Sequence, residues 1–396
     1  MAEQQVGIVG AGIIGLALAR QIALTTPGAA VTVIEKEPTV AAHQTGHNSG
    51  VVHAGVYYAP NSLKARLCRR GVGMLRMYCA ERSLPYEACG KLIVARSQQE
   101  IIRLAEIRRR AEINGVPGLR WLDAVELREV EPNVVGAAAL HSPTTAITDF
   151  RAVAQALAND VVAAGGTIRL ATPVRGVEVA GDRAQVVTEV ERLTFDRVVV
   201  CAGLHADRLA RSAGDSIAPM IIPFRGEYLR LIPEREGLIR ALVYPVPDPR
   251  YPFLGVHFTR RVGGGVDIGP NAVLALSREG YRWRDVSGRD LAETIRFRGF
   301  HHLVARHWRT GVRESAGSLL RRLYLAQARS FVPSLTAADV VSAPAGVRAQ
   351  AVDPDGSLVD DFRISHLGPV TAVRNAPSPG ATSSLAIAEY IAERLA

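Results

Sequence analysis

Apolar and polar blocks follow one another along the first 35 residues, and they predict a strand, a helix and a second strand. Val6–Val9 is a short apolar run suited to a buried strand, and residues 16–24 form a helical segment without glycine or proline. A second apolar run, Val31–Ile34, ends at Glu35. This order is typical of a βαβ unit with a parallel pair of strands.

Three glycines lie between the first strand and the helix. Gly10 permits a tight turn, Gly12 lets the backbone approach a pyrophosphate, and Gly15 lets the helix pack on the strand. The pyrophosphate is expected at the helix N-terminus, where free N–H groups favour an anion. Glu35 is placed to accept ribose hydroxyls. The pattern predicts a dinucleotide site rather than an apolar N-terminus with incidental glycines.

The remaining hydrophobic pattern predicts several more elements. Helical periodicity is found over residues 63–82, 98–115, 150–164, 289–329 and 385–395. Apolar runs typical of strands cover residues 86–95, 167–173, 174–179 and 195–201. Short runs separated by proline and glycine predict an antiparallel sheet, with strands at 225–231, 242–245, 254–259 and 266–268.

Composition narrows the class of protein. The 396 residues suffice for two domains, and 48% hydrophobic with 21% charged residues is ordinary for a globular enzyme. No run reaches the roughly 18 apolar residues of a membrane span. The four cysteines lack metal-type spacing, so we expect reduced thiols, a cytoplasmic location and no metal site; they are Cys68, Cys79, Cys89 and Cys201.

The net charge of +9 leaves three kinds of partner open: nucleic acid, anionic lipid or an acidic substrate. Arginines are concentrated in the predicted helices of residues 289–329. No aromatic stacking residues are interleaved with them, so we expect no nucleic acid partner. They form either a solvated surface or a surface for peripheral association with the inner face of a membrane.

Residues 43–58 are rich in glycine and small polar side chains and contain three histidines, His43, His47 and His53. A nicotinamide dehydrogenase would normally continue here with another plain βα unit. Such a loop is better suited to a flavoprotein, in which backbone and short side chains surround the phosphates and the flavin ring. A glycine-rich surface loop is the alternative interpretation.

A series of sequence blocks carries a resemblance that extends through the chain. The most specific are GHNSGVVHAGVYY at residues 46–58 and NAPSPGAT at residues 375–382. Others are SLKA at 62–65, PFRGEY at 223–228, GVHFTR at 255–260, GPNAVLA at 269–275, GVRAQ at 346–350 and LVDDF at 358–362. These blocks resemble the L-2-hydroxyglutarate oxidase/dehydrogenase family of the FAD-dependent, D-amino-acid-oxidase-like superfamily. Gly263–Gly265 departs from the family's pattern and affects only loop detail.

The resemblance implies an α/β fold of the two-domain α+β flavoprotein type. A Rossmann-like domain would bind FAD without a covalent bond, and a second domain would be built on an antiparallel sheet. The FAD-binding domain is expected to comprise residues 1–82, 146–222 and 333–396. The substrate-binding domain is expected to comprise residues 83–145 and 223–332.

The glycine motif and the resemblance together define the predicted cofactor residues. The C-terminal segment is expected to offer a helix N-terminus to the flavin edge that becomes negative on reduction. The full predicted set is Gly10, Gly12, Ile13, Ile14, Gly15, Glu35, Lys36, Thr45, His47, Asn48, Ser49, Gly50, Val174, Ala202, Gly203, Pro379, Gly380, Ala381 and Thr382.

The substrate implied by the resemblance is a small dicarboxylate hydroxy acid, L-2-hydroxyglutarate, which would be oxidised to 2-oxoglutarate. A bidentate arginine best fixes the plane of the α-carboxylate, and the resemblance points to Arg348. A histidine can remove the hydroxyl proton near neutral pH, with His53 first and His257 second in order. The second carboxylate has four candidate partners: Arg260, Lys64, Tyr58 and His257.

Two questions stay open at this stage. A related flavoenzyme oxidising another 2-hydroxy acid, an amino acid or glycerol 3-phosphate would carry a similar nucleotide motif. The final electron acceptor is also undetermined between oxygen, a membrane quinone and an electron-transfer protein.

Overall fold

The protein is described by a computed structural model covering residues 4–248, 255–319 and 321–395. Its first sheet has six strands in the order β20-β21-β13-β1-β2-β9, all parallel except for the edge strand β20. The strands are β1 Gln4–Val9, β2 Ala29–Ile34, β9 Thr167–Arg169, β13 Arg197–Val200, β20 Arg363–Leu367 and β21 Val370–Asn375.

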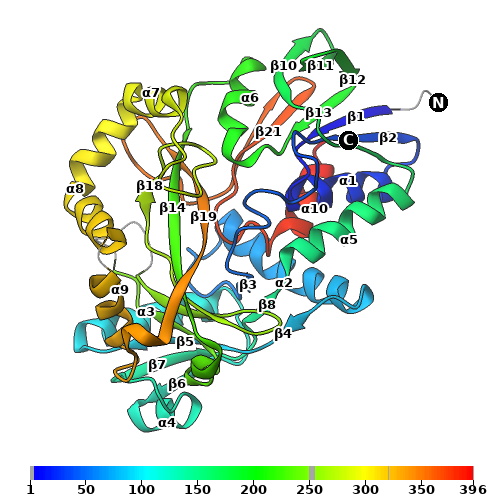
Figure 1. Ribbon diagram of the computed structural model, residues 1–396. Helices are drawn as coiled ribbons and strands as arrows, with labels where there is room; N and C mark the ends of the chain where they lie inside the picture. The colour runs from blue at the N-terminus through cyan, green and yellow to red at the C-terminus, as the bar shows by residue number, and fades with distance from the viewer. Residues whose placement is uncertain (1–3, 249–254, 320, 396) are drawn as a thin grey trace.

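Helices and a small sheet cover the two faces of this sheet (Figure 1). On one face, α1 lies in an apolar core shared with α5, α10 and α2. The other face packs on α6 and on a three-stranded antiparallel sheet of β10, β11 and β12. The bounds are α1 Ile13–Thr25, α2 Leu63–Glu81, α5 Phe150–Ala163, α6 Ala206–Ser212, α10 Ser384–Ala392, β10 Val174–Ala180, β11 Arg183–Thr188 and β12 Arg192–Phe195.

The second sheet has nine strands in the order β18-β14-β17-β16-β15-β5-β7-β6, with β19 also paired to β14. All its pairs are antiparallel except β15 with β5. The strands are β5 Lys91–Ala95, β6 Arg120–Asp123, β7 Ala138–Ser142, β14 Met220–Leu231, β15 Leu242–Pro245, β16 His257–Arg260, β17 Val266–Gly269, β18 Val273–Leu274 and β19 Val340–Val352.

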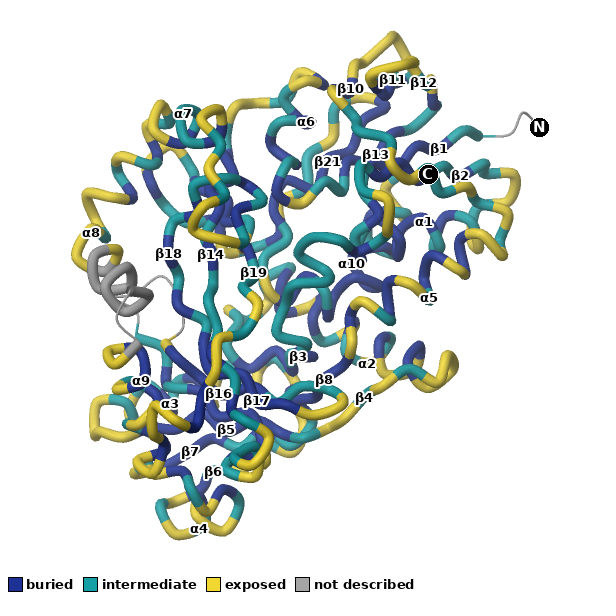
Figure 2. The backbone as a smooth tube through the Cα atoms, in the orientation of Figure 1, coloured by how far each residue is buried: buried dark blue, intermediate teal, exposed yellow. Residues whose placement is uncertain are grey.

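Further short elements surround the second sheet, and their outer surfaces are largely exposed (Figure 2). The helices are α3 Gln98–Ile113, α4 Ala124–Val130, α7 Gly288–Arg296, α8 Arg298–Leu319 and α9 Arg321–Arg329, with 3₁₀ turns at Gly203–His205, Pro233–Leu238 and Ala337–Asp339. A small antiparallel sheet consists of β3 Val51–Val52, β4 Tyr86–Glu87 and β8 Ala146–Thr148. Within the described residues, no helix combines the length and the apolar character needed to cross a membrane.

The two faces of the second sheet differ in polarity. Leu92, Val243 and Phe258 belong to an apolar core shared with α9. Because neighbouring strand residues point to opposite faces, their partners in sequence point the other way. Lys91, Tyr244 and His257, which adjoin these three residues in sequence, therefore lie on the opposite face. Asp267 and Tyr228 lie there as well, because they adjoin Ile268 and Leu229 of the same core. Polar side chains buried in this way need hydrogen-bond or charge partners.

The predicted α/β architecture with a second, mainly antiparallel sheet is confirmed, but one predicted strand was wrong. Residues 86–95 form two strands in different sheets, β4 and β5, instead of one. Gly90 interrupts them with φ +74°, in the left-handed region that glycine adopts readily. Part of the predicted strand at 254–259 lies outside the described residues, since Leu254 is not described, and β16 begins at His257.

A buried ion pair joins the structures built on the two sheets. Arg278 donates to Asp207 of α6 and to the carbonyl of Leu204 at 2.6 Å, and both charged side chains are almost fully buried. Burial alone would raise the pKa of Asp207, but the Arg278 guanidinium lowers it. The pair therefore fixes the segment that follows β13 against the second half of the chain.

Arg278→Met should lower the free energy of unfolding by about 3–5 kcal/mol, because the Asp207 carboxylate stays buried without its counter-charge. Urea unfolding followed by tryptophan fluorescence measures the change. Arg175→Met is the control, since Arg175 pairs with Glu189 on the exposed surface and such pairs contribute about 1 kcal/mol or less. Equal unfolding midpoints for the two variants would contradict this role for the buried pair.

Candidate active site

The glycine turn between β1 and α1 is shaped by close backbone contacts. Gly10 has φ +109°, and a Cβ there would lie 2.5 Å from the carbonyl oxygen of Cys201. A Cβ at Gly15 would overlap the carbonyl oxygen of Gly10. The N-cap of α1, Gly12, provides no side-chain cap. The first turn of the helix is thus packed tightly beneath. Its Ile13 N–H donates to Thr45 Oγ1 at 3.1 Å, and Gly12, Ile13 and Ile14 line the cavity, where a helix N-terminus favours an anion.

Glu35 lies beside this turn and is buried. Its carboxylate accepts hydrogen bonds from the N–H of Ala11 at 2.7 Å and of Glu37 at 3.0 Å. Each carboxylate oxygen can accept further bonds. The side chain therefore holds the glycine turn in shape and keeps acceptor capacity for ribose hydroxyls.

A cavity of about 560 Å³ runs from this turn toward the second sheet. All the predicted cofactor residues line it except Gly15 and Gly50. Gly15 supports the turn from beneath, and Gly50 has φ +73° and accepts a backbone hydrogen bond from Thr148. The cavity is enclosed by segments from the beginning, the middle and the end of the chain.

These residues fit a dinucleotide cofactor on structural grounds. The uncapped start of α1, the Glu35 carboxylate and the close approach of Gly10 to the strand end at Cys201 form one continuous cradle. A second helix start, α10, has no side-chain cap at Ser383, and the buried hydroxyls of Ser383 and Ser384 lack partners among the described residues. The segment before α10 reaches the cavity through Pro379–Thr382, and a helix N-terminus behind it favours negative charge on a bound group.

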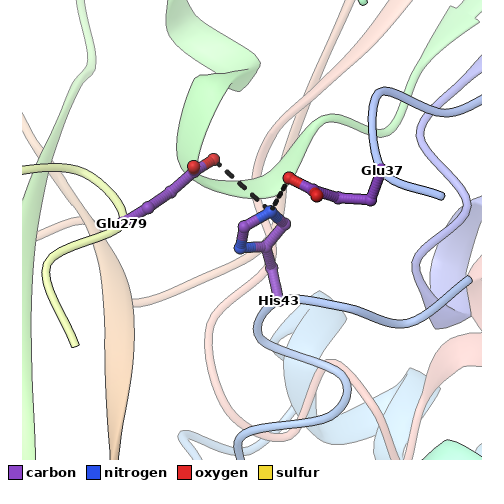
Figure 3. A group of neighbouring side chains, drawn as sticks. All are labelled: Glu37, His43 and Glu279. Carbon is purple, nitrogen blue, oxygen red and sulfur yellow. Dashed lines mark hydrogen bonds and ion pairs between the residues drawn. The ribbon is translucent and has the colours of Figure 1, made fainter. Parts of the chain in front are cut away.

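Lys36 lies in a charged cluster at the edge of the cavity. Figure 3 shows Glu37, His43 and Glu279 with their polar ends together. The Lys36 ammonium contacts all three, at 2.5 Å, 2.8 Å and 2.7 Å respectively. Burial opposes it, but hydrogen bonds from His205 and Lys36 lower the pKa of Glu279 to about 2. Because the Lys36 ammonium lies where a cation would, we assign no metal to the cluster.

Arg348 and Tyr228 form one wall of the cavity. They lie on the paired strands β19 and β14, where Arg348 is opposite Phe224. The Arg348 side chain is accessible from the cavity, yet the surrounding protein lowers the pKa of its guanidinium. Burial raises the pKa of Tyr228 to about 12, although the nearby Arg348 charge opposes this. The wall thus presents a partly desolvated cation to the cavity.

His53 lines the same cavity and is held at several points. Its N–H donates to Thr382 Oγ1 at 3.1 Å, and its carbonyl accepts from Cys68 Sγ at 3.2 Å. The ring atom Nε2 lies 3.1 Å from Ser378 Oγ. Burial lowers the pKa of His53 well below 6.5, and the Lys91 charge lowers it further. The imidazole is therefore neutral at physiological pH.

His257 lies behind this site rather than in the cavity wall. It is buried, its Nδ1 is 2.9 Å from the carbonyl of Gly255, and its ring stacks on Tyr244 with centroids 3.9 Å apart. Burial lowers its pKa to about 3. Arg348 contributes to the same shift, so the two side chains are close enough to interact.

The other three predicted substrate residues do not line the cavity. Lys64 donates to the carbonyl and the carboxylate of Asp360 at 2.8 Å, and its Nζ lies 5.1 Å from the centre of the Tyr58 ring. Arg260 is three positions from His257, on the face of β16 that carries Phe258. Its guanidinium donates to the carbonyl of Arg240 at 3.0 Å. The structure does not bring Arg260 to the cavity.

Sequence reasoning missed several cavity residues. Phe224, Gly226 and Tyr228 all line the cavity, and their spacing of two is the signal of one strand face. Ser378, inside the NAPSP block, contacts His53 and was not singled out. His205, Arg208 and Glu279 line the far end of the cavity and come together only through tertiary structure.

Comparisons with known proteins agree with this geometry. The family described as FAD dependent oxidoreductase matches residues 5–394. A relative from Nematostella vectensis named L-2-hydroxyglutarate dehydrogenase, mitochondrial, is 45% identical over 99% of this chain and 90% of its own length. L-2-hydroxyglutarate dehydrogenase from Salmonella houtenae is 44% identical over 98% of this chain and 92% of its own length.

Among solved structures, the L-alpha-glycerophosphate oxidase of Mycoplasma pneumoniae with FAD bound has a TM-score of 0.79. It is 23% identical, and the match covers 100% of this chain and 95% of that one. A likeness at that identity shows the shared fold. The whole-length matches to the curated relatives go further: the chain belongs to the FAD dependent oxidoreductase family and, within it, to the L-2-hydroxyglutarate dehydrogenases.

Proposed function

We propose that the protein oxidises L-2-hydroxyglutarate to 2-oxoglutarate with non-covalent FAD as the immediate electron acceptor. The observation that carries the proposal is an arginine and a neutral histidine facing one cavity, Arg348 and His53. They offer the two functions that a 2-hydroxy acid needs, a carboxylate partner and a proton acceptor. Relatives of that name at 45% and 44% identity support the same substrate.

The cofactor would be held by the cavity's glycine turn, by Glu35 and by the segment Pro379–Thr382. When bound, FAD supplies the acceptor for the hydride that leaves C2 of the substrate. The two-domain division follows from this proposal. Residues 1–82, 146–222 and 333–396 would carry FAD, and residues 83–145 and 223–332 would carry most of the substrate wall.

Arg348 is proposed to bind the α-carboxylate of the substrate. A guanidinium forms two parallel hydrogen bonds with a carboxylate, and this fixes the plane of the group as well as its position. Its partly desolvated surroundings strengthen the interaction compared with water. A fixed α-carboxylate leaves C2 little freedom to rotate, so its hydrogen keeps one direction.

His53 is proposed to take the hydroxyl proton at Nε2. A neutral imidazole accepts there only when Nδ1 carries its single proton. Nε2 then has one lone pair, so the substrate hydroxyl replaces Ser378 Oγ, 3.1 Å from Nε2, as its partner. Backbone contacts to Thr382 and Cys68 keep the ring in place. The hydroxyl proton thus moves to His53 as the hydride leaves C2, and the hydroxyl becomes the carbonyl.

The proposal predicts which compounds reduce the enzyme-bound flavin. Under anaerobic conditions, L-2-hydroxyglutarate should bleach the flavin absorbance, and the D enantiomer should not, because inverting C2 with the carboxylate fixed turns its hydrogen away. Amino acids and glycerol 3-phosphate are measured in parallel. If an amino acid or glycerol 3-phosphate bleaches the flavin faster than L-2-hydroxyglutarate does, that compound is the better substrate and the proposal is wrong.

His53→Ala should leave FAD bound and slow flavin reduction by roughly 10²–10⁴-fold, the usual contribution of a positioned proton acceptor. Stopped-flow absorbance with L-2-hydroxyglutarate measures the rate, and the flavin content of the purified variant is the control for folding. A wild-type rate of reduction in this variant would remove His53 from the mechanism.

We further propose that the enzyme acts from the cytoplasm at the inner face of a membrane and passes electrons to a quinone. The support is the outer surface of α7–α9, where basic and apolar side chains are exposed together. The exposed set includes Ile295, Arg296, Arg298, Val304, Arg306, Trp308, Arg309 and Leu323. Each basic residue near an anionic surface contributes about 1 kcal/mol, and an exposed tryptophan suits the headgroup region.

Binding to vesicles that contain an anionic phospholipid should therefore be observed at low salt and lost at high salt, where charges are screened. Cosedimentation measures it, with neutral vesicles as the control. A double variant, Arg306→Glu with Arg309→Glu, should weaken binding and leave flavin reduction unchanged. Equal binding to neutral and anionic vesicles would contradict the electrostatic mechanism.

A further inference from the structure

The loop between β18 and α7 crosses to the cofactor end of the cavity. Residues 276–287, all of them described, contain no helix or strand. The N–H of Ser287 donates to the carbonyl of Leu276 at 3.0 Å, so the two ends of the loop lie together. Compact surface loops with adjoining ends are frequently functional. We call residues 276–287 the strap.

The base of the strap is fixed by Arg278. Its guanidinium forms the buried ion pair with Asp207, and its N–H donates to the Asp290 carboxylate of α7 at 2.8 Å. A second contact joins the strap to β14, where the Arg225 guanidinium lies 4.2 Å from the centre of the Trp283 ring. The base of the strap is therefore held by buried charged groups on two other elements.

The tip of the strap contacts the loop that follows β2. The Tyr281 ring lies against the His47 ring, with centroids 4.5 Å apart, and the Tyr281 hydroxyl is 3.2 Å from Nδ1 of His43. Both histidines line the cavity, and His47 is among the predicted cofactor residues. The aromatic contact thus joins the strap to the segment that encloses the cofactor.

Glu279 makes the charged contact of the same tip. Its carboxylate lies 2.7 Å from Nζ of Lys36 and 2.9 Å from Nε2 of His205. Lys36 follows β2 and His205 follows β13, so this one side chain reaches two segments of the first sheet. Figure 3 shows the Glu279 side chain pointing toward His43. The strap is therefore tied to the nucleotide-binding part of the chain by charge as well as by ring contact.

These contacts lie at the nucleotide end of the cavity. Lys36 directly follows Glu35, the acid placed for the ribose hydroxyls, and Lys36, His205 and Glu279 all line the cavity. The strap itself belongs to residues 223–332, which are expected to carry the substrate wall. A segment outside the nucleotide motif thus covers the nucleotide.

The two attachments of the strap differ in strength. Arg278 and Asp207 at its base are almost fully buried, whereas Glu279 and Tyr281 at its tip are partly exposed. Contacts that water can replace open more readily than buried ones. A strap with a fixed base and a weaker tip can swing at the tip without unfolding the protein around it.

A non-covalent dinucleotide leaves an enclosing cavity only when part of the wall moves. We propose that the strap is a gate for FAD, which Glu279 and Tyr281 latch closed against the segments after β2 and β13. Entry and release of FAD require the latch to open. The inference rests on the FAD site of the proposed function, and it does not depend on the substrate.

A gate differs in its kinetics from a direct contact with the cofactor. The latch joins protein groups to one another, so weakening it favours the open state of the empty and the loaded protein alike. Entry and release then become faster by the same factor, and the Kd for FAD stays the same. Loss of a direct contact accelerates release alone and raises the Kd.

Glu279→Gln should accelerate the release of FAD by roughly 10- to 100-fold, the range expected when charge-assisted hydrogen bonds are lost. Holoenzyme is mixed with an excess of isotope-labelled FAD, and the label that stays with the protein on gel filtration gives the rate of exchange. The Kd is obtained from flavin fluorescence on serial dilution of the holoenzyme. It should stay close to the wild-type value.

Tyr281→Ala tests the latch without changing a charge, and it should also accelerate exchange. Tyr281→Phe keeps the ring and should have a smaller effect. The matched control is Glu178→Gln, which removes a carboxylate from an exposed pair with Arg192 and should exchange FAD at the wild-type rate. Flavin content and thermal midpoint establish that each variant folds, and Tyr281→Ala decides the matter if Glu279→Gln does not.

The outcomes separate the gate from its alternatives. Faster release with an equal rise in Kd would make the mutated side chain a direct contact of FAD and overturn the gate. Exchange at the wild-type rate in both Glu279→Gln and Tyr281→Ala would also overturn it. A wild type that holds FAD but is not reduced by L-2-hydroxyglutarate would refute the proposed function and leave the gate standing.

Discussion

The antiparallel ladder between β14 and β19 is the constraint that relates the two halves of this molecule. At one end, Ile221 and Ala351 pack with Leu204 beside the first sheet. At the other end, Leu231 and Val340 belong to the core of the second sheet. The register shifts between Gly226 and Tyr228, at the level of the cavity. A single strand pair thus connects the core of the second sheet with the apolar cluster around Leu204, and it carries Arg348 to the cavity wall. The two strands lie side by side in Figure 1.

The nucleotide half could be predicted from sequence because its signals are local. Glycine spacing, an apolar strand and an acid at the next strand end all lie within 35 residues, and short-range sterics decide their arrangement. The part of the protein that is built on the second sheet could be predicted only in outline. The break at Gly90 separates β4 from β5 and places Lys91 at the start of a central strand, which no periodicity around it indicates. The alternation of side chains along a strand could have shown that Arg260 does not lie beside His257, since residues three apart on a strand point to opposite faces.

Positive charge is concentrated near the two histidines of the site, since Arg348 and Lys91 both lower their pKa values. Lys36 and Lys64 have carboxylate partners, whereas the described surroundings of Lys91 offer aromatic rings. His53 and His257 remain neutral because burial lowers their pKa values, and the charges of Lys91 and Arg348 lower them further. The Arg348 cation in the cavity wall favours a ligand that carries negative charge, and it disfavours amines.

The pairing of α1 with α10 has a consequence for how the protein is made. These helices come from opposite ends of the chain and share one apolar core, in which Leu16 and Ile387 are both buried. The flavin cradle uses the turn before the first helix and the segment before the last. A nascent polypeptide can therefore complete this cradle only after residues 379–392 have left the ribosome. The turn before α1 is made first but cannot enclose the cofactor until the segment before α10 has been synthesised and has joined it.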